Sequence, residues 1–202
     1  MSKFYKELDG KLQEFIAKQK IFFVGTAAAE GRVNMSPKGM DSLRILNANQ
    51  LIWLNLTGSG NETAAHVLGQ PRMTLMFCSF EEKPLILRVY GKARAIHPRD
   101  DEWAEWITLF PEFPGSRQIF LLDVDSAQPS CGFAVPNYQY QEDRGELIHW
   151  TEKIGDEGVK EYWKKNNQTS VDGKPTNILI NPLAREADGN DSLSRDNSLS
   201  AK

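Results

Sequence analysis

The chain has 202 residues, of which 40% are hydrophobic and 25% are charged, and its net charge is −3. This is the balance of a soluble domain with a substantial core. The small negative charge and the lack of a basic cluster argue against a nucleic acid or an anionic membrane as partner. We therefore expect no nucleic acid and no membrane as partner.

The N-terminus and the cysteines bear on location and on metal binding. Charges recur through the first 11 residues, where a signal peptide would need an apolar segment. Cys78 and Cys131 form no CxxC pair, and the three histidines lie far apart in the sequence. The sequence therefore predicts no metal site and two buried free thiols. We expect a cytoplasmic location, or also a nuclear one in a eukaryotic cell.

The first two thirds of the chain alternate short apolar runs with turn signals. Residues 4–19 carry an amphipathic pattern that predicts a helix over one end of the fold. Runs rich in β-branched and aromatic residues then predict antiparallel strands. These runs lie at 21–27, 33–36, 42–46, 51–56, 72–80 and 85–96, and a further one lies at 117–125.

A short helix interrupts the strands between residues 61 and 69. It follows the loop Gly58-Ser59-Gly60, and Ser59 or Asn61 is a suitable cap. Such a turn offers free backbone amides to an anion. Ser59, Asn61 and Thr63 are therefore candidate phosphate donors, although a plain helix cap explains them equally well.

The last third is predicted as helices joined by loops. Apolar positions predict helices at about 102–110 and 157–166, and residues 128–136 read as a tight, ordered loop. From residue 183 onward few large apolar groups remain, so we expect one domain over residues 1–182 and a disordered tail over 183–202.

The order and spacing of several motifs resemble the pyridoxamine 5′-phosphate oxidase-related family. The motifs are Val33-Asn34-Met35-Ser36-Pro37-Lys38-Gly39, residues 54–64, residues 71–77, Gly91-Lys92-Ala93 and residues 130–136. The resemblance implies the family's mainly β (α+β) fold, a six-stranded antiparallel split barrel with Greek-key topology that is flanked by helices. It also implies a homodimer with FMN at the subunit interface and a small-molecule substrate.

The resemblance also assigns candidate FMN contacts. Lys38 and Arg44 lie near the places of the family's phosphate-binding cations, and Asn55 lies where that family meets the flavin. Gln128 and Ser130 resemble an element that reaches the flavin across the dimer. Together with the helix entry, the implied cofactor-binding residues are Lys38, Arg44, Asn55, Ser59, Asn61, Thr63, Gln128 and Ser130.

Two departures leave the activity open. Glu62 and Thr63 stand where the oxidases have two cations, and no Arg-rich segment follows near the C-terminus. One hypothesis is an FMN-dependent oxidoreductase that acts on pyridoxamine or pyridoxine 5′-phosphate or another small planar substrate, with no identified catalytic residue. The alternatives are a non-catalytic split-barrel dimer that has lost FMN and serves as a binding module, or a barrel for a different ligand such as haem.

Overall fold

The computed structural model describes residues 3–179. The predicted tail at 183–202, and the boundary at 182, lie outside the described residues. No helix in the described part is long and apolar enough to cross a membrane.

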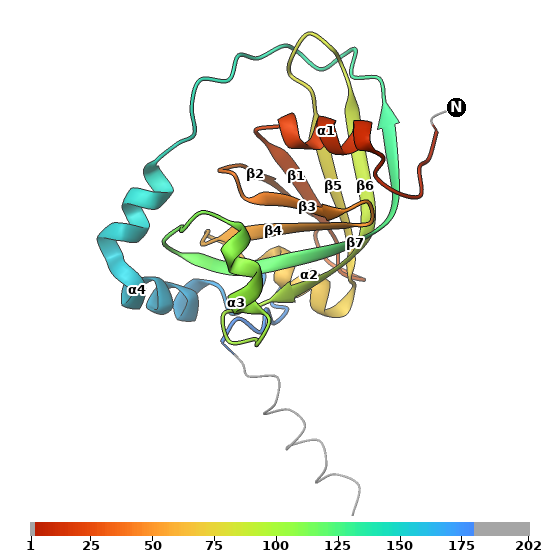
Figure 1. The fold of residues 1–202 in the computed structure, drawn as a ribbon. Helices are drawn as coiled ribbons and strands as arrows, with labels where there is room; N and C mark the ends of the chain where they lie inside the picture. Colours follow the sequence, from red (N-terminus) through yellow and green to blue (C-terminus); the bar gives the residue numbers. More distant parts are fainter. Residues whose placement is uncertain (1–2, 180–202) are drawn as a thin grey trace, which may run out of the picture.

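One antiparallel sheet of seven strands forms the body of the molecule (Figure 1). The resemblance implied six strands, whereas the sheet has seven, one for each of the seven apolar runs in the sequence; the run at 33–36 pairs along the whole of β1 as an edge strand. The strands are β1 (Phe22–Thr26), β2 (Asn34–Lys38), β3 (Leu43–Asn47), β4 (Gln50–Leu56), β5 (Arg72–Cys78), β6 (Ile86–Ile96) and β7 (Ser116–Ser130).

The strand order is β2-β1-β5-β6-β7-β4-β3. Strands β5, β6 and β7 follow one another as antiparallel neighbours, and β4 returns to lie beside β7, which is the Greek-key arrangement. The sheet curls so that residues of β2 and β4 line one cavity, although the two strands are not neighbours in the strand order. The expected mainly β split-barrel class is confirmed.

Strand β7 is longer than the sequence indicated. It pairs with β6 as far as Ser130, opposite Ile86, so residues 128–130 belong to the strand and not to the loop predicted at 128–136. The reason is that β6 has 11 residues and offers backbone partners along its whole length.

The interior of the barrel is filled by large apolar side chains from opposite walls. Trp53 on β4 is fully buried, and its ring stacks on Phe120 of β7 with centroids 4.8 Å apart. Phe22 of β1 meets Trp53 edge-on at 6.1 Å and stacks on Phe77 at 5.9 Å. The nearly continuous burial of β4 agrees with its apolar sequence.

Four α-helices and one 3₁₀ turn flank the barrel in the described part of the chain (Figure 1). Helix α1 begins after Asp9, whose carboxylate accepts the backbone N–H of Leu12 at 2.9 Å, and it sends Leu12 and Ile16 into the core. It is shorter than the predicted helix over residues 4–19. The helices are α1 (Gly10–Lys18), α2 (Glu62–Gly69), α3 (Trp103–Trp106) and α4 (Glu146–Asn166), and the 3₁₀ turn spans Ile107–Leu109.

Helix α4 starts 11 residues before the predicted position at 157. Gly155, with φ +65°, breaks it into two helical segments, and that break explains why the apolar pattern pointed only to the second segment. The segment 131–145 connects β7 to α4 as a long arch (Figure 1). Cys131 lies at its start and is exposed, so the prediction of two buried thiols holds only for Cys78.

The core packing makes a stability prediction. Leu75 is fully buried at the centre of the sheet, opposite Val24 on one side and Val89 on the other. Leu75→Ala should lower the free energy of unfolding by about 2–5 kcal/mol, because it removes buried contacts and leaves a cavity. Leu68→Ala, at a half-exposed site on α2, should change it by less than about 0.5 kcal/mol in the same denaturant titration. If Leu75→Ala and Leu68→Ala lowered the free energy of unfolding by the same amount, this assignment of the core would be contradicted.

Candidate functional site

A polar cavity of about 450 Å³ lies where β2 and β4 face each other. Its walls are the end of β2, the end of β4, the loop that enters α2, and one side chain from β7. The lining residues used below are Asn34, Ser36, Lys38, Asn55, Ser59, Asn61, Glu62, Thr63 and Arg117.

Arg117 is the most deeply buried charge in the described part of the chain, with 3% of its surface exposed. Its Nη1 donates to the carbonyl oxygen of Gly60 at 2.9 Å and to Oδ1 of Asn167 at 2.8 Å, with a longer contact to Gly58 at 3.4 Å. All three acceptors are neutral. Burial lowers the pKa of Arg117 to about 10, which still leaves the guanidinium charged at neutral pH.

Lys38 brings a second positive charge to the same cavity. Its Nζ lies 5.3 Å from the centroid of the Trp53 ring, a cation–π contact at the mouth of the barrel. Burial, and then the charge of Arg117, lower the pKa of Lys38 from 10.5 to about 8. Among residues 3–179 no carboxylate forms an ion pair with either cation. Two partly dehydrated cations that no carboxylate pairs with favour an anion in this cavity, which Glu62 also lines.

The start of α2 adds donors to this site. Asn61 occupies the N-cap position, but its side chain makes no cap hydrogen bond; its Nδ2 donates to the carbonyl oxygen of Asn167 instead, at 3.3 Å. The first backbone N–H groups of α2 therefore have no side-chain cap at the wall of the cavity. Thr63 accepts from Nδ2 of Asn34 at 3.1 Å, which fixes its hydroxyl beside β2.

Several polar atoms of the lining residues are buried and have no hydrogen-bond partner among the described residues. They are Ser36 Oγ, Asn55 Oδ1, Asn61 Oδ1 and Arg117 Nε. Buried polar groups are nearly always hydrogen-bonded in native proteins, so four such atoms around one cavity indicate a polar ligand.

Glu62 was the strongest argument from the sequence against an anion here. Its carboxylate accepts the backbone N–H of Val171, with Oε1 at 3.0 Å and Oε2 at 3.2 Å. The segment that follows α4 thus orients this carboxylate, which keeps its charge at the edge of the cavity that Glu62 lines. That segment is also held by Asp172, which accepts the backbone N–H of Arg32 at 2.7 Å and pairs with its guanidinium.

Three of the eight predicted cofactor residues lie outside the cavity. Arg44 pairs with Asp41 at 2.7 Å, donates to the carbonyl oxygen of Leu109, and lines a different cavity between α1 and β3. Gln128 accepts from the Tyr90 hydroxyl, and Ser130 accepts from Arg88, both on the β6–β7 part of the sheet. The other five, Lys38, Asn55, Ser59, Asn61 and Thr63, line one cavity.

Sequence reasoning missed Arg117. The available signal was a single cation at the start of an apolar strand, directly after the turn Gly115-Ser116. Such a residue is commonly a solvated strand end, and only the fold reveals that this one points inward.

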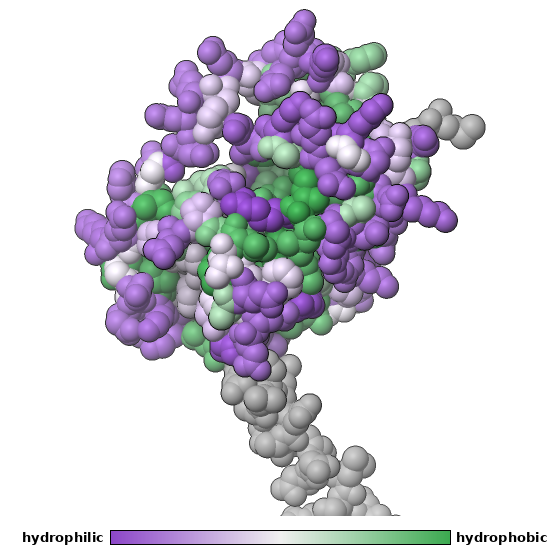
Figure 2. Space-filling model, in the orientation of Figure 1, coloured by the Kyte–Doolittle hydropathy of each residue, from purple (hydrophilic) through white to green (hydrophobic). Residues whose placement is uncertain are grey.

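A second, larger cleft of about 1210 Å³ adjoins the cavity and shares Pro37, Lys38 and Gly39 with it. The arch at 131–145 contributes to its walls, where Tyr138 packs on Phe80 with ring centroids 5.5 Å apart. Figure 2 shows the molecule from the side of Figure 1 in space-filling form, with apolar surface over β3 and β4 between α1 and α3 and hydrophilic residues around it. The two cavities together offer an anion site next to a wider aromatic one.

Comparison with known proteins identifies the family. The family model described as pyridoxamine 5′-phosphate oxidase matches residues 8–131. The pyridoxamine 5′-phosphate oxidase family protein ustO of Aspergillus flavus is 31% identical over 192 residues, covering 85% of this chain and 76% of that protein. The chain belongs to the pyridoxamine 5′-phosphate oxidase family.

Solved structures agree on the fold. A variant of HupZ from Group A Streptococcus matches with a TM-score of 0.50 at 18% identity, over 61% of this chain and 99% of that one. A candidate pyridoxamine 5′-phosphate oxidase from Lactobacillus delbrueckii also matches with a TM-score of 0.50, at 20% identity, over 61% of this chain and 94% of that one. Within residues 3–179, no group of three or more His, Cys, Asp or Glu side chains is arranged to hold a metal ion.

The unpaired charge of Lys38 makes a prediction about pH. Because the pKa of Lys38 is lower in the folded state than in the unfolded state, the folded protein gains stability as pH rises from about 8 to 10.5. Lys38→Met should abolish that gain and stabilise the ligand-free protein at pH 7 by about 1–2 kcal/mol. Denaturant titrations at pH 7 and at higher pH measure both effects.

The matched control is Lys20→Met, at an exposed lysine just before β1. It should leave the stability and its pH dependence within about 0.5 kcal/mol of the wild type. Destabilisation by Lys38→Met at pH 7 would mean that the Lys38 charge is already compensated in the folded protein.

Proposed function

We propose that this chain binds FMN through its phosphate in the cavity between β2 and β4, and that it is an FMN-dependent oxidoreductase. The observation that carries the proposal is the pair of cations, Lys38 and Arg117, at one cavity with no acidic partner among residues 3–179. An anion bound there recovers the electrostatic free energy that their burial costs.

The residues present fit a phosphate ester. Its two negative charges match the two cations, and its oxygens match the uncapped N–H groups at the start of α2. Ser59 and Thr63 add hydroxyl groups at the same wall. The aromatic cleft that shares Lys38 with the cavity suits a planar group attached to the phosphate. Family membership supports the same ligand, since the resemblance of the chain implies FMN.

When bound, the flavin supplies the redox chemistry. The chain's own residues then have the tasks of binding and orientation: Arg117 and Lys38 hold the anionic end, and the residues of the cleft exclude water from the planar end. The proposed reaction therefore needs no nucleophilic side chain. Pyridoxamine or pyridoxine 5′-phosphate, or another small planar molecule, is the proposed substrate class.

We further propose a homodimer. Val33, just before the edge strand β2, and Met35 within it are exposed by 75% and 58%, although both are apolar. An apolar edge strand beside a ligand cavity is suited to burial against a second copy. The resemblance implies that Gln128 and Ser130, which lie outside the cavity in one chain, reach the ligand of the other copy. Met35→Lys should shift the wild-type dimer toward monomer in sedimentation-velocity experiments, and a monomeric wild type would overturn this part of the proposal.

Binding of FMN is the decisive measurement. Purified wild-type protein should take up FMN, with quenching of flavin fluorescence on titration. Arg117→Met should weaken FMN binding about tenfold to hundredfold, roughly the loss of one charge-assisted hydrogen bond. Arg44→Met, at an arginine that is already paired with Asp41, should leave the affinity within about threefold of the wild type.

Arg117 also ties together the 58–60 loop and Asn167, so its variant requires a check on folding. Lys38→Met, which we expect to be more stable than the wild type, provides a second test that misfolding cannot mimic. Wild-type protein that binds no FMN would overturn the proposal and favour the alternative of a split-barrel binding module without flavin.

A further inference from the structure

A row of buried polar side chains leads from the cavity into the protein. It begins with Asn55 on β4 and Gln118 on β7, which are partners in the β4–β7 register. Both are buried, with exposures of 2% and 0%. Nδ2 of Asn55 donates to Oε1 of Gln118 at 3.1 Å. The amide of Asn55 is thereby oriented with its nitrogen toward Gln118.

The next member is His97, which follows β6. Its Nε2 lies 3.4 Å from Nε2 of Gln118. Because Oε1 of Gln118 already accepts from Asn55, its Nε2 is the donor to His97, and Nε2 of His97 must accept. The hydrogen of the neutral imidazole is then on Nδ1, on the side of Asp100.

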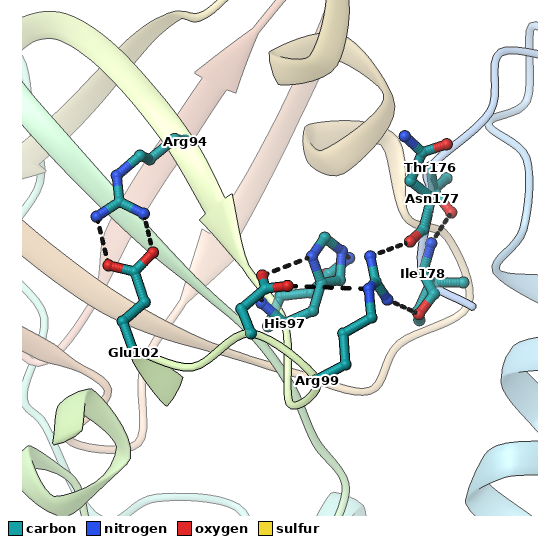
Figure 3. Close-up of polar contacts among 9 residues, drawn as sticks. Arg94, His97, Arg99, Glu102, Thr176, Asn177 and Ile178 are labelled. Atoms are coloured by element: carbon teal, nitrogen blue, oxygen red, sulfur yellow. Dashed lines mark hydrogen bonds and ion pairs between the residues drawn. The ribbon is translucent and has the colours of Figure 1, made fainter. Parts of the chain in front are cut away.

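Asp100 fixes that choice. Its Oδ2 accepts the backbone N–H of His97 at 2.8 Å and faces Nδ1 of the same residue at 3.5 Å (Figure 3). Burial, and then the charge of Arg99, lower the pKa of His97 to about 4, so the imidazole is neutral at physiological pH. A carboxylate on the Nδ1 side and a neutral ring together select the Nδ1–H form.

The outer end of the row is anchored to the C-terminal part of the described chain. Arg99 donates to the carbonyl oxygens of Asn177 and Ile178, each at 2.6 Å, while its Nε lies 3.9 Å from Oδ1 of Asp100 (Figure 3). Figure 3 also shows the Arg94–Glu102 ion pair, which lies to one side of this row. The row therefore has one fixed end and one end at the cavity.

The direction of the row decides what the cavity offers its ligand. With the Nδ1–H form of His97, Oδ1 of Asn55 is the atom that has no partner among the described residues. With the opposite form, Gln118 and Asn55 would both turn over, and the Asn55 amide would present its N–H₂ group instead. One proton position thus selects between an acceptor and a donor at the wall of the cavity.

We propose that Asn55 presents its side-chain oxygen to the ligand as a hydrogen-bond acceptor, and that Gln118 and His97 are positioning residues that hold this orientation. The proposal rests on the ligand site proposed above and narrows its ligand class. The ligand carries an O–H or N–H donor near its phosphate-bearing end; the hydroxyl groups of FMN meet this requirement. A ligand with only acceptor atoms at that position would place one of them against the side-chain oxygen of Asn55, with no hydrogen between the two, and would bind more weakly.

The first test needs no ligand. Long-range ¹⁵N–¹H correlation spectra of the full chain at pH 7 distinguish the two neutral forms of a histidine ring. The proposal expects His97 to be protonated on Nδ1 and not on Nε2, and this signal should disappear in His97→Gln. An Nε2–H form, or a charged imidazolium at pH 7, would overturn the proposed orientation.

The second test compares two probes, FMN and inorganic phosphate. His97→Leu removes the acceptor for Gln118, so FMN should bind at least about tenfold more weakly than it binds to the wild type. Inorganic phosphate contacts the two cations but carries no attached hydroxyl chain that could donate to Asn55, so its affinity should stay within about threefold of the wild type. His97→Gln, whose side-chain oxygen can accept from Gln118, should restore most of the FMN affinity. Glu102→Gln, outside the row, should change neither affinity.

These outcomes separate a positioning role from general support of the fold. Equal weakening of both probes by His97→Leu, or no weakening of either, would overturn the proposal. Failure of the wild type to bind FMN would overturn the FMN proposal only, because the ring-protonation test is independent of it. The same comparison would then use glycerol 3-phosphate, whose hydroxyl groups lie beside its phosphate, and equal binding by wild type and His97→Leu would overturn the acceptor role.

Discussion

The buried guanidinium of Arg117 is the interaction on which the candidate site depends. A charge removed from water must be surrounded by acceptors, and here the acceptors are the carbonyl oxygens of the 58–60 loop and the side chain of Asn167. The same contacts hold the loop at the entry of α2, the start of β7 and the end of α4 in one place. Because all these acceptors are neutral, none of them cancels the charge of Arg117, and this is the basis of the anion site that we propose.

The split barrel explains why this charge can be present at all. The sheet is hydrogen-bonded along its length, but β2 and β4 meet at the cavity without being neighbours in the strand order. Lys38 closes this gap from β2 by lying over Trp53 of β4. The polar cavity thus adjoins the packed aromatic core, and β4 contributes to both, with Trp53 in the core and Asn55 in the wall of the cavity. The site is in this sense a consequence of how the barrel closes.

Much of the fold could be predicted from the sequence, and the site only in part. Alternating apolar runs located the strands, because burial on one face of a strand has a period of two residues. The same reasoning could not distinguish Arg44 from Arg117. Each is a cation within or beside an apolar strand, and only tertiary contacts show that Asp41 pairs with Arg44 while no carboxylate in the described chain pairs with Arg117. The early start of α4 was hidden for a local reason, the positive φ of Gly155.

The part of the chain after the matched family region contributes directly to the site. The family model covers residues 8–131, whereas Asn167, Val171 and the residues bound by Arg99 lie beyond it. Asn167 accepts hydrogen bonds from Arg117 and from Asn61, and the backbone N–H of Val171 donates to the carboxylate of Glu62. This segment therefore fixes the first residues of α2 and the guanidinium beside them. Its contacts to Arg99 also support the row of side chains that ends at Asn55. The barrel supplies the two cations, and the C-terminal segment holds Arg117, Asn61 and Glu62 in place around the cavity.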